Sequence, residues 1–193
     1  MSMDGSGEMT GDSTRCVHSS LDPEVTTGSV HTPIFQTSTY VQNDFADHLG
    51  YEYARGDNPT RNALQRALAE MESPHQEAYG FCFGSGMAAI TTISQMLKQG
   101  DHVIACDDLY GGTVRLFDQI ASRFGIETTY SPLNTGDLGK VVRDNSKILW
   151  LESPTNPLLT VHDIKSLAAE AKEHGLIVVV DSTFATPILQ RPF

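Results

Sequence analysis

Short apolar runs alternate with longer amphipathic segments from residue 78 to residue 193. The segments between the runs have helical periodicity, and three of them are closed by Gly100, Gly125 and Gly175, a residue type that commonly ends helices. Strands separated by helices of this length predict right-handed βαβ units, and therefore an α/β domain whose mostly parallel sheet is covered by helices on both faces. The predicted strands are AYGFCF (78–83), HVIAC (102–106), IETTYS (126–131), KILWLE (147–152) and LIVVVD (176–181).

The first part of the chain has a different pattern. Residues 1 to about 30 carry few apolar side chains and no periodicity, which predicts a loose arm. The stretch TPIFQTSTYV (32–41) is rich in β-branched and aromatic residues but contains Pro33, so we expect an extended segment or an edge strand. In NPTRNALQRALAEME (58–72), Asn58 suits the N-cap of an amphipathic helix and Pro59 its first turn. We therefore predict an N-terminal arm and loop over 1–57 and part of an α/β domain over 58–193.

Charge and hydropathy exclude several classes of protein. The chain has 13 basic and 24 acidic residues, a net charge of −11, whereas nucleic-acid binding needs clustered Lys and Arg. No apolar run approaches the roughly 18 residues that cross a bilayer, and the polar, acidic N-terminus is unlike a signal peptide. We therefore expect no nucleic-acid or membrane partner, and a cytoplasmic enzyme.

Cysteine and histidine do not follow the spacing of metal ligands. The three cysteines, Cys16, Cys82 and Cys106, lack CxxC spacing, and two of them lie in apolar runs. The seven histidines form no HxxxH pair. We predict packing roles for the cysteines in apolar runs and no metal site.

A glycine-rich loop follows the first predicted strand. In parallel sheets ligands bind at the carboxyl ends of the strands, and in FGSGMAAI the loop opens a helix whose N-terminal amides could bind a phosphate at Ser85, Gly86 and Met87. A tight turn that suits close packing of the helix on the sheet explains the small residues equally well.

The same loop also matches a dinucleotide-binding pattern. Gly84, Gly86 and Ala89 fit the G-x-G-x-x-A fingerprint, and Asp107 ends the next strand, where a ribose-binding acid is expected. On these residues alone, a Rossmann-type module is a second hypothesis.

Three further strand ends carry residues suited to a flat, charged ligand. Tyr110 follows a strand beside two glycines and could stack on a ring, or cap the edge of the core. Asn156 lies between two prolines that rigidify its loop, or belongs to an ordinary turn. Asp181 could be an N-cap, a magnesium ligand or the partner of a protonated ring nitrogen, and its neighbours Ser182 and Thr183 are neutral, which disfavours a metal. A carboxylate that keeps a pyridine nitrogen protonated is the requirement of pyridoxal phosphate chemistry.

The loop YEYARGDNPTRN precedes the first firm helix. Its Arg55 suits a phosphate and its Tyr53 a hydroxyl contact, although a solvated surface accounts for a single exposed Arg as well.

Taken together, the order and spacing of these motifs resemble the Cys/Met-metabolism family of pyridoxal-phosphate enzymes, which includes cystathionine γ-synthase, cystathionine γ-lyase and methionine γ-lyase. The resemblance covers most of the chain from about residue 14. The matching stretches are TGSVHTPIFQTSTY, YEYARGDNPTRNALQRALAEME, FGSGMAAI, DDLYGGT, ESPTNP and VVVDSTFATPILQRP. It implies the large domain of a type I, aspartate-aminotransferase-like fold and pyridoxal 5'-phosphate as the cofactor.

The resemblance also implies roles for single residues. Ser85, Gly86 and Met87 would hold the cofactor phosphate, and Tyr110 would stack on the pyridine ring. Asp181 would pair with the ring nitrogen and, with Tyr110, act in catalysis, and Asn156 and Thr183 would lie nearby. Tyr53 and Arg55 match a YxYxR motif that reaches the active site of a neighbouring subunit, which implies a homo-oligomer, a dimer or a dimer of dimers.

One departure concerns the lysine that forms the Schiff base. In the family it lies in an S-x-T-K segment shortly after LQRP, which residues 1–193 do not include, so we expect the chain to match about half of a family member and to form no lysine adduct alone. The implied function is γ-elimination or γ-replacement on amino acids of the cystathionine or O-acylhomoserine type. Gly112 stands where many methionine γ-lyases carry a cysteine, which favours a cystathionine synthase or lyase. An inactive paralogue that binds a full-length partner is a third hypothesis.

Overall fold

The computed structural model describes residues 11–19 and 22–193. They form two compact units, one of residues 11–19 and 22–82 with Phe193, the other of residues 83–192. The helix predicted over 58–72 belongs to the first unit. The division into an arm and a cofactor-binding domain at residues 57 and 58 stays a prediction.

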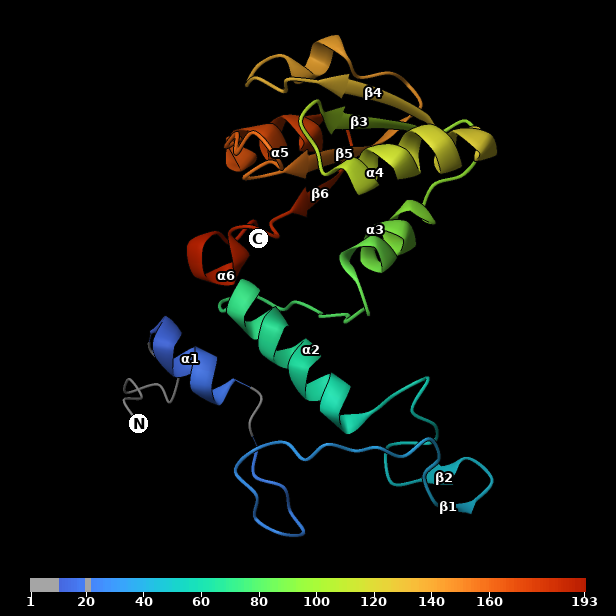
Figure 1. Cartoon of the computed structure of the whole chain (residues 1–193), viewed down its shortest axis with the longest axis vertical. Coiled ribbons are helices and arrows are strands. Elements are labelled where there is room, and N and C mark those ends of the chain that lie inside the picture. Colours follow the sequence, from blue (N-terminus) through green and yellow to red (C-terminus); the bar gives the residue numbers. More distant parts are fainter. Residues whose placement is uncertain (1–10, 20–21) are drawn as a thin grey trace. The chain divides into compact units, whose positions relative to one another are not determined.

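A four-stranded parallel sheet forms the centre of the second unit (Figure 1). Its strands are β3 (His102–Cys106), β4 (Glu127–Ser131), β5 (Ser146–Glu152) and β6 (Ile177–Asp181), in the order β4-β3-β5-β6. Four of the five predicted strands and the parallel sheet are therefore confirmed. The chain leaves β3 toward one edge of the sheet and β5 toward the other, so the strand order reverses between them. In open α/β sheets such a reversal marks the place where ligands bind.

Helices connect these strands as the alternation predicts. Right-handed crossovers that run in opposite directions place the helix after β3 and the helix after β5 on opposite faces of the sheet. The helix after β3 changes its winding along its length, from α to π to 3-10, before Gly125 ends it in the left-handed conformation. The elements are α3 (Gly86–Ser94), α4 (Gly111–Arg115), η1 (Leu116–Ile120), η2 (Ala121–Phe124), η3 (Leu138–Lys140), α5 (Ile164–Glu173) and α6 (Thr186–Leu189).

The core of this unit lies along its two central strands. All five residues of β3 are buried, and in β5 every residue except Lys147 is buried. Trp150 packs edge-on against Phe117, with ring centroids 5.4 Å apart. Burial raises the pKa of the Cys106 thiol to about 12, so this cysteine has the packing role that was predicted.

The first unit contains little regular structure apart from helix α2 (Pro59–Glu72). The side chain of Asn58 accepts hydrogen bonds from the N–H groups of Thr60 and Arg61, which confirms the predicted N-cap. A two-stranded antiparallel ribbon, β1 (Gln42–Asp44) and β2 (Asp47–His48), precedes it. Residues 32–41 form no helix or strand, and Thr39 forms a single bridge with Tyr53.

Three predictions about secondary structure are wrong. The helix expected to end at Gly100 ends at Ser94, with Gln95 as its C-cap. Part of the predicted loose arm is helix α1 (Asp12–His18), in which Asp12 lies in the first turn and forms an ion pair of 3.6 Å with Arg15. An acidic residue near the start and a basic one near the end stabilise a helix without any burial, so the lack of apolar residues does not preclude it.

The stretch 78–83 is not a strand, although its composition is that of a buried one. Tyr79 and Phe81 are about three-quarters exposed, and among the described residues no strand pairs with this stretch. Strand formation requires a partner, and local composition does not supply one.

None of the helices in residues 11–19 and 22–193 has both the length and the apolar character needed to cross a bilayer.

Candidate functional site

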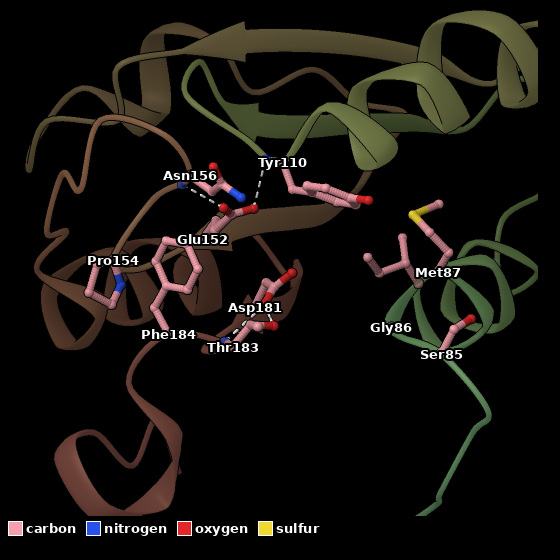
Figure 2. A pocket seen from close by; sticks show the side chains of 11 residues that line it. Ser85, Gly86, Met87, Tyr110, Glu152, Pro154, Asn156, Asp181, Thr183 and Phe184 are labelled. Carbon is pink, nitrogen blue, oxygen red and sulfur yellow. Dashed lines mark hydrogen bonds between the residues drawn. The ribbon is translucent and has the colours of Figure 1, made fainter.

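A cavity of about 300 Å³ lies at the carboxyl ends of the strands, next to the reversal between β3 and β5. Its size is at the lower end of the range typical of small-molecule sites. Figure 2 shows side chains from the start of α3 facing those from the ends of β3, β5 and β6. The cavity is lined by Ser85, Gly86, Met87, Ile90, Tyr110, Glu152, Pro154, Asn156, Asp181, Thr183 and Phe184. All seven site residues predicted in this unit are brought together here.

The N-terminus of α3 forms one wall of the cavity. Ser85 is the N-cap, and its hydroxyl accepts a hydrogen bond of 3.2 Å from the N–H of Ala88. A Cβ placed on Gly84 or Gly86 would meet no atom within 4 Å, so the backbone there faces open space. Amides at the start of a nine-residue helix, accessible through glycine, suit an anion such as a phosphate.

Tyr110 forms the opposite wall. It is the N-cap residue of α4, and its side chain is 40% exposed. A Cβ placed on Gly112 would lie 2.4 Å from Cε1 of Tyr110 and 2.6 Å from Sδ of Met87. Only glycine at position 112 therefore leaves room for these two side chains where they lie. A partly exposed aromatic ring held in this way can stack on a flat ligand.

Asp181 ends β6 and carries its carboxylate into the cavity (Figure 2). Its Oδ1 atom accepts a hydrogen bond of 3.0 Å from the N–H of Thr183 and another from the Thr183 hydroxyl. Thr183 thus fixes the orientation of the carboxylate, and Phe184 and Pro154 add apolar surface beside it. A fixed carboxylate in a partly apolar cavity suits a cationic ring nitrogen.

Glu152 is a residue of this site that the sequence analysis missed. It is only 4% exposed, and its two oxygens accept the backbone N–H of Tyr110 at 3.0 Å and that of Asn156 at 2.7 Å (Figure 2). Burial raises the pKa of Glu152, the two N–H donors lower it, and the carboxylates of Asp181 and Asp108 raise it. The signal in the sequence is its place at the end of an apolar run, where the period-2 pattern puts it on the face of Trp150.

The loop that carries Asn156 is fixed by a second carboxylate. Asp108 accepts a hydrogen bond from the Thr155 hydroxyl and another, of 3.1 Å, from the N–H of Leu158. The peptide bonds before both prolines of ESPTNP, Pro154 and Pro157, are cis. The two hydrogen bonds accepted by Asp108 hold the loop that carries Asn156.

The remaining predicted site residues, Tyr53 and Arg55, belong to the first unit. The guanidinium of Arg55 lies 5.2 Å from the centroid of the Tyr53 ring. Arg61 shapes their loop, because it donates hydrogen bonds to the carbonyl oxygens of Ala54 and Gly56. Their predicted contact with a phosphate in a neighbouring subunit stays a prediction.

The other hypotheses find less support in this geometry. A dinucleotide site requires an acid at Asp107. Asp107 is not among the residues that line this cavity, all of which lie within the described range 22–193. Within residues 11–19 and 22–193 no group of three or more His, Cys, Asp and Glu side chains is placed to hold a metal ion.

Comparison with known proteins identifies the family. A family model described as "Cys/Met metabolism PLP-dependent enzyme" matches residues 13–193. The chain belongs to this family. Pyridoxal phosphate is therefore the cofactor of its family, as predicted, and the residues of the cavity fit it: amides at a helix N-terminus for the phosphate, an aromatic ring for the pyridine, and a carboxylate for the ring nitrogen.

Named relatives agree with this assignment. A probable cystathionine gamma-synthase of Herpetosiphon aurantiacus is 46% identical over 94% of the chain and 56% of that protein. A cystathionine beta-lyase of Coxiella burnetii is 46% identical over 93% of the chain and 46% of that protein. The crystal structure of cystathionine gamma-lyase from Lactobacillus plantarum, complexed with L-serine, superimposes with a TM-score of 0.87 and 38% identity, covering 95% of the chain and 47% of that structure. The type I fold is therefore confirmed, and the chain spans about half the length of the relatives it matches.

Proposed function

We propose that this chain is part of a pyridoxal-phosphate-dependent enzyme. The enzyme makes or breaks a carbon–sulfur bond in amino acids of the cystathionine type. The observation that carries the proposal is the convergence of the α3 N-terminus, the Tyr110 ring and the Asp181 carboxylate on one cavity. These three features complement the phosphate, the ring face and the ring nitrogen of the same small molecule.

Each feature has its own task toward the cofactor. The amides of Gly86 and Met87, with Ser85, would bind the phosphate, and Tyr110 would cover one face of the ring. Asp181, oriented by Thr183, would hold a proton on the ring nitrogen, and the Asn156 side chain would lie near the ring hydroxyl. When bound, pyridoxal phosphate supplies the electron sink that stabilises a carbanion on an amino-acid substrate.

The substrate class and the reaction type rest on the relatives. Their names include cystathionine gamma-synthase, cystathionine gamma-lyase and cystathionine beta-lyase, so β-elimination joins the γ-elimination and γ-replacement expected from the motifs. Cleavage at Cγ of cystathionine releases cysteine and cleavage at Cβ releases homocysteine. Chromatography of the thiol released from cystathionine by the active enzyme would therefore distinguish the two eliminations.

The assembly is proposed on the same basis. Tyr53 and Arg55 match the motif through which one subunit grips the phosphate in its neighbour, so we propose a homo-oligomer, and we propose that it works in the cytoplasm. Size-exclusion chromatography with light scattering would measure the oligomeric state, and a strictly monomeric, active enzyme would contradict this part of the proposal.

Cofactor binding by the 193-residue chain tests the central proposal. We expect saturable binding of pyridoxal phosphate, followed by the circular dichroism that a bound cofactor acquires. Pyridoxal without its phosphate should bind more weakly, because the α3 N-terminus would be left without its anion. Saturable binding of NADH without any response to pyridoxal phosphate would instead favour the dinucleotide-binding hypothesis.

A further inference from the structure

The buried carboxylate of Glu152 connects two loops of the cavity that are far apart in the sequence. One oxygen accepts the N–H of Tyr110, 42 positions earlier, and the other accepts the N–H of Asn156, four positions later. Both oxygens of one side chain are therefore engaged by backbone donors, and each donor belongs to a residue whose side chain lines the cavity.

This geometry does not suit a group that exchanges protons with a substrate. Glu152 is 4% exposed, and its oxygens point to the backbone of the two loops rather than into the open part of the cavity (Figure 2). An acid or base must lie within hydrogen-bond reach of the group that it serves. The contacts of Glu152 instead fix where its neighbours lie.

We propose that Glu152 is a positioning residue, which holds the Tyr110 ring and the Asn156 side chain at the places from which they contact the bound cofactor. This inference rests on the proposed function, because it assigns Glu152 a role toward the same cofactor. Without the carboxylate, the two loops are free to shift, and cofactor binding has to order them again.

Only glutamate satisfies both donors at this position. Glutamine has the same size, but its NH₂ group would face one of the two N–H donors and leave it without an acceptor. Aspartate keeps the charge but is shorter by one C–C bond, about 1.5 Å, and cannot span both loops at the present distances. A buried donor without an acceptor is unfavourable, so both substitutions should loosen at least one loop.

The test compares Glu152→Gln with Glu170→Gln in the 193-residue chain. Glu170 is a matched control because its carboxylate also accepts a backbone N–H, that of Gly136 at 2.6 Å, but it does not line the cavity. Three properties are measured: the affinity for pyridoxal phosphate, the circular dichroism of the bound cofactor, and hydrogen exchange of the Tyr110 and Asn156 amides in the ligand-free protein.

We expect Glu152→Gln to weaken cofactor binding on the order of tenfold and to change the dichroism, with faster exchange of at least one of the two amides. Glu170→Gln should leave all three properties as in the wild type. Wild-type affinity and dichroism in Glu152→Gln would overturn the inference while leaving the proposed function intact. If the wild-type chain binds no pyridoxal phosphate, the proposed function fails, and unchanged amide exchange in Glu152→Gln then overturns the inference by itself.

Discussion

The Tyr110 ring lies so close to Gly112 that a single methyl group at position 112 would come within 2.4 Å of it. The same methyl group would come within 2.6 Å of Met87. Because Gly112 has no side chain, it leaves room for the two side chains that face each other across the cavity. Any side chain at position 112 would therefore displace Tyr110 or Met87 and change the shape of the cavity.

We expect Gly112→Ala to lower the affinity for pyridoxal phosphate by about tenfold, because overpacking displaces Tyr110 or Met87. Gly111→Ala is the matched control, since a Cβ there would meet only the mobile end of Arg115 at 3.3 Å. Titration of both variants with the cofactor measures the difference. Equal affinities would show that the Tyr110 ring moves aside without consequence.

Asp181→Asn tests the negative charge at the end of β6. Asparagine keeps the shape and can still accept the N–H of Thr183, but it removes the negative charge that we propose for pairing with the ring nitrogen. Because hydrogen bonds to charged groups contribute about 1.5–3 kcal/mol, cofactor affinity should fall at least tenfold. Asp163→Asn, a substitution at the N-cap of α5 outside the cavity, should leave the affinity unchanged. A wild-type affinity in Asp181→Asn would exclude the predicted charge pairing.

Loss of the Asn58 cap should destabilise α2. Asn58→Ala removes the acceptor of the Thr60 and Arg61 amides, which typically costs about 1 kcal/mol of helix stability. Hydrogen exchange of these two amides should become faster. Asn62→Ala, inside the same helix, keeps the cap and should leave their exchange rates close to those of the wild type.

The parallel sheet could be predicted from the sequence because its signals are local. HVIAC and KILWLE are short apolar runs bounded by polar residues and turns, and the buried β3 and β5 have this composition. AYGFCF has the same composition and is not a strand, since pairing depends on a partner elsewhere in the chain. The change from α to π and 3-10 winding after Arg115 also has no signal in composition.

The sequence predicts those site residues whose type is unusual at their position in the chain. Tyr110 and Asp181 stand out after strands and Gly86 stands out at the start of a helix, and the structure brings them to one cavity. Glu152 does not stand out, because a glutamate at the end of a strand is ordinarily solvated. Its significance comes from the Tyr110 amide, 42 positions away, and only the folded chain shows that contact.

At the amino ends of the strands, His102 forms a buried polar cluster far from the carboxyl ends that line the cavity. Its Nδ1 lies 2.8 Å from the Ser146 hydroxyl and its Nε2 lies 2.8 Å from the Thr129 hydroxyl. Arg143 donates to both hydroxyl groups, from its backbone N–H to Ser146 and from its guanidinium to Thr129. Burial lowers the pKa of His102, the charge of Arg143 lowers it further, and Glu127, which pairs with Arg143, raises it.

This cluster should make the stability of the protein depend on pH. The pKa of His102 in the folded state lies below its value of about 6.5 in the unfolded state, so the unfolded chain binds more protons as the pH falls. The contribution of neutral His102 is therefore fully present above about pH 6.5 and is lost as the pH falls through the folded-state pKa. Urea unfolding of the wild type between pH 5 and 8 should show this decline, and His102→Asn, which cannot be protonated, should show a smaller one. Parallel pH profiles of the two proteins would assign the decline to other groups.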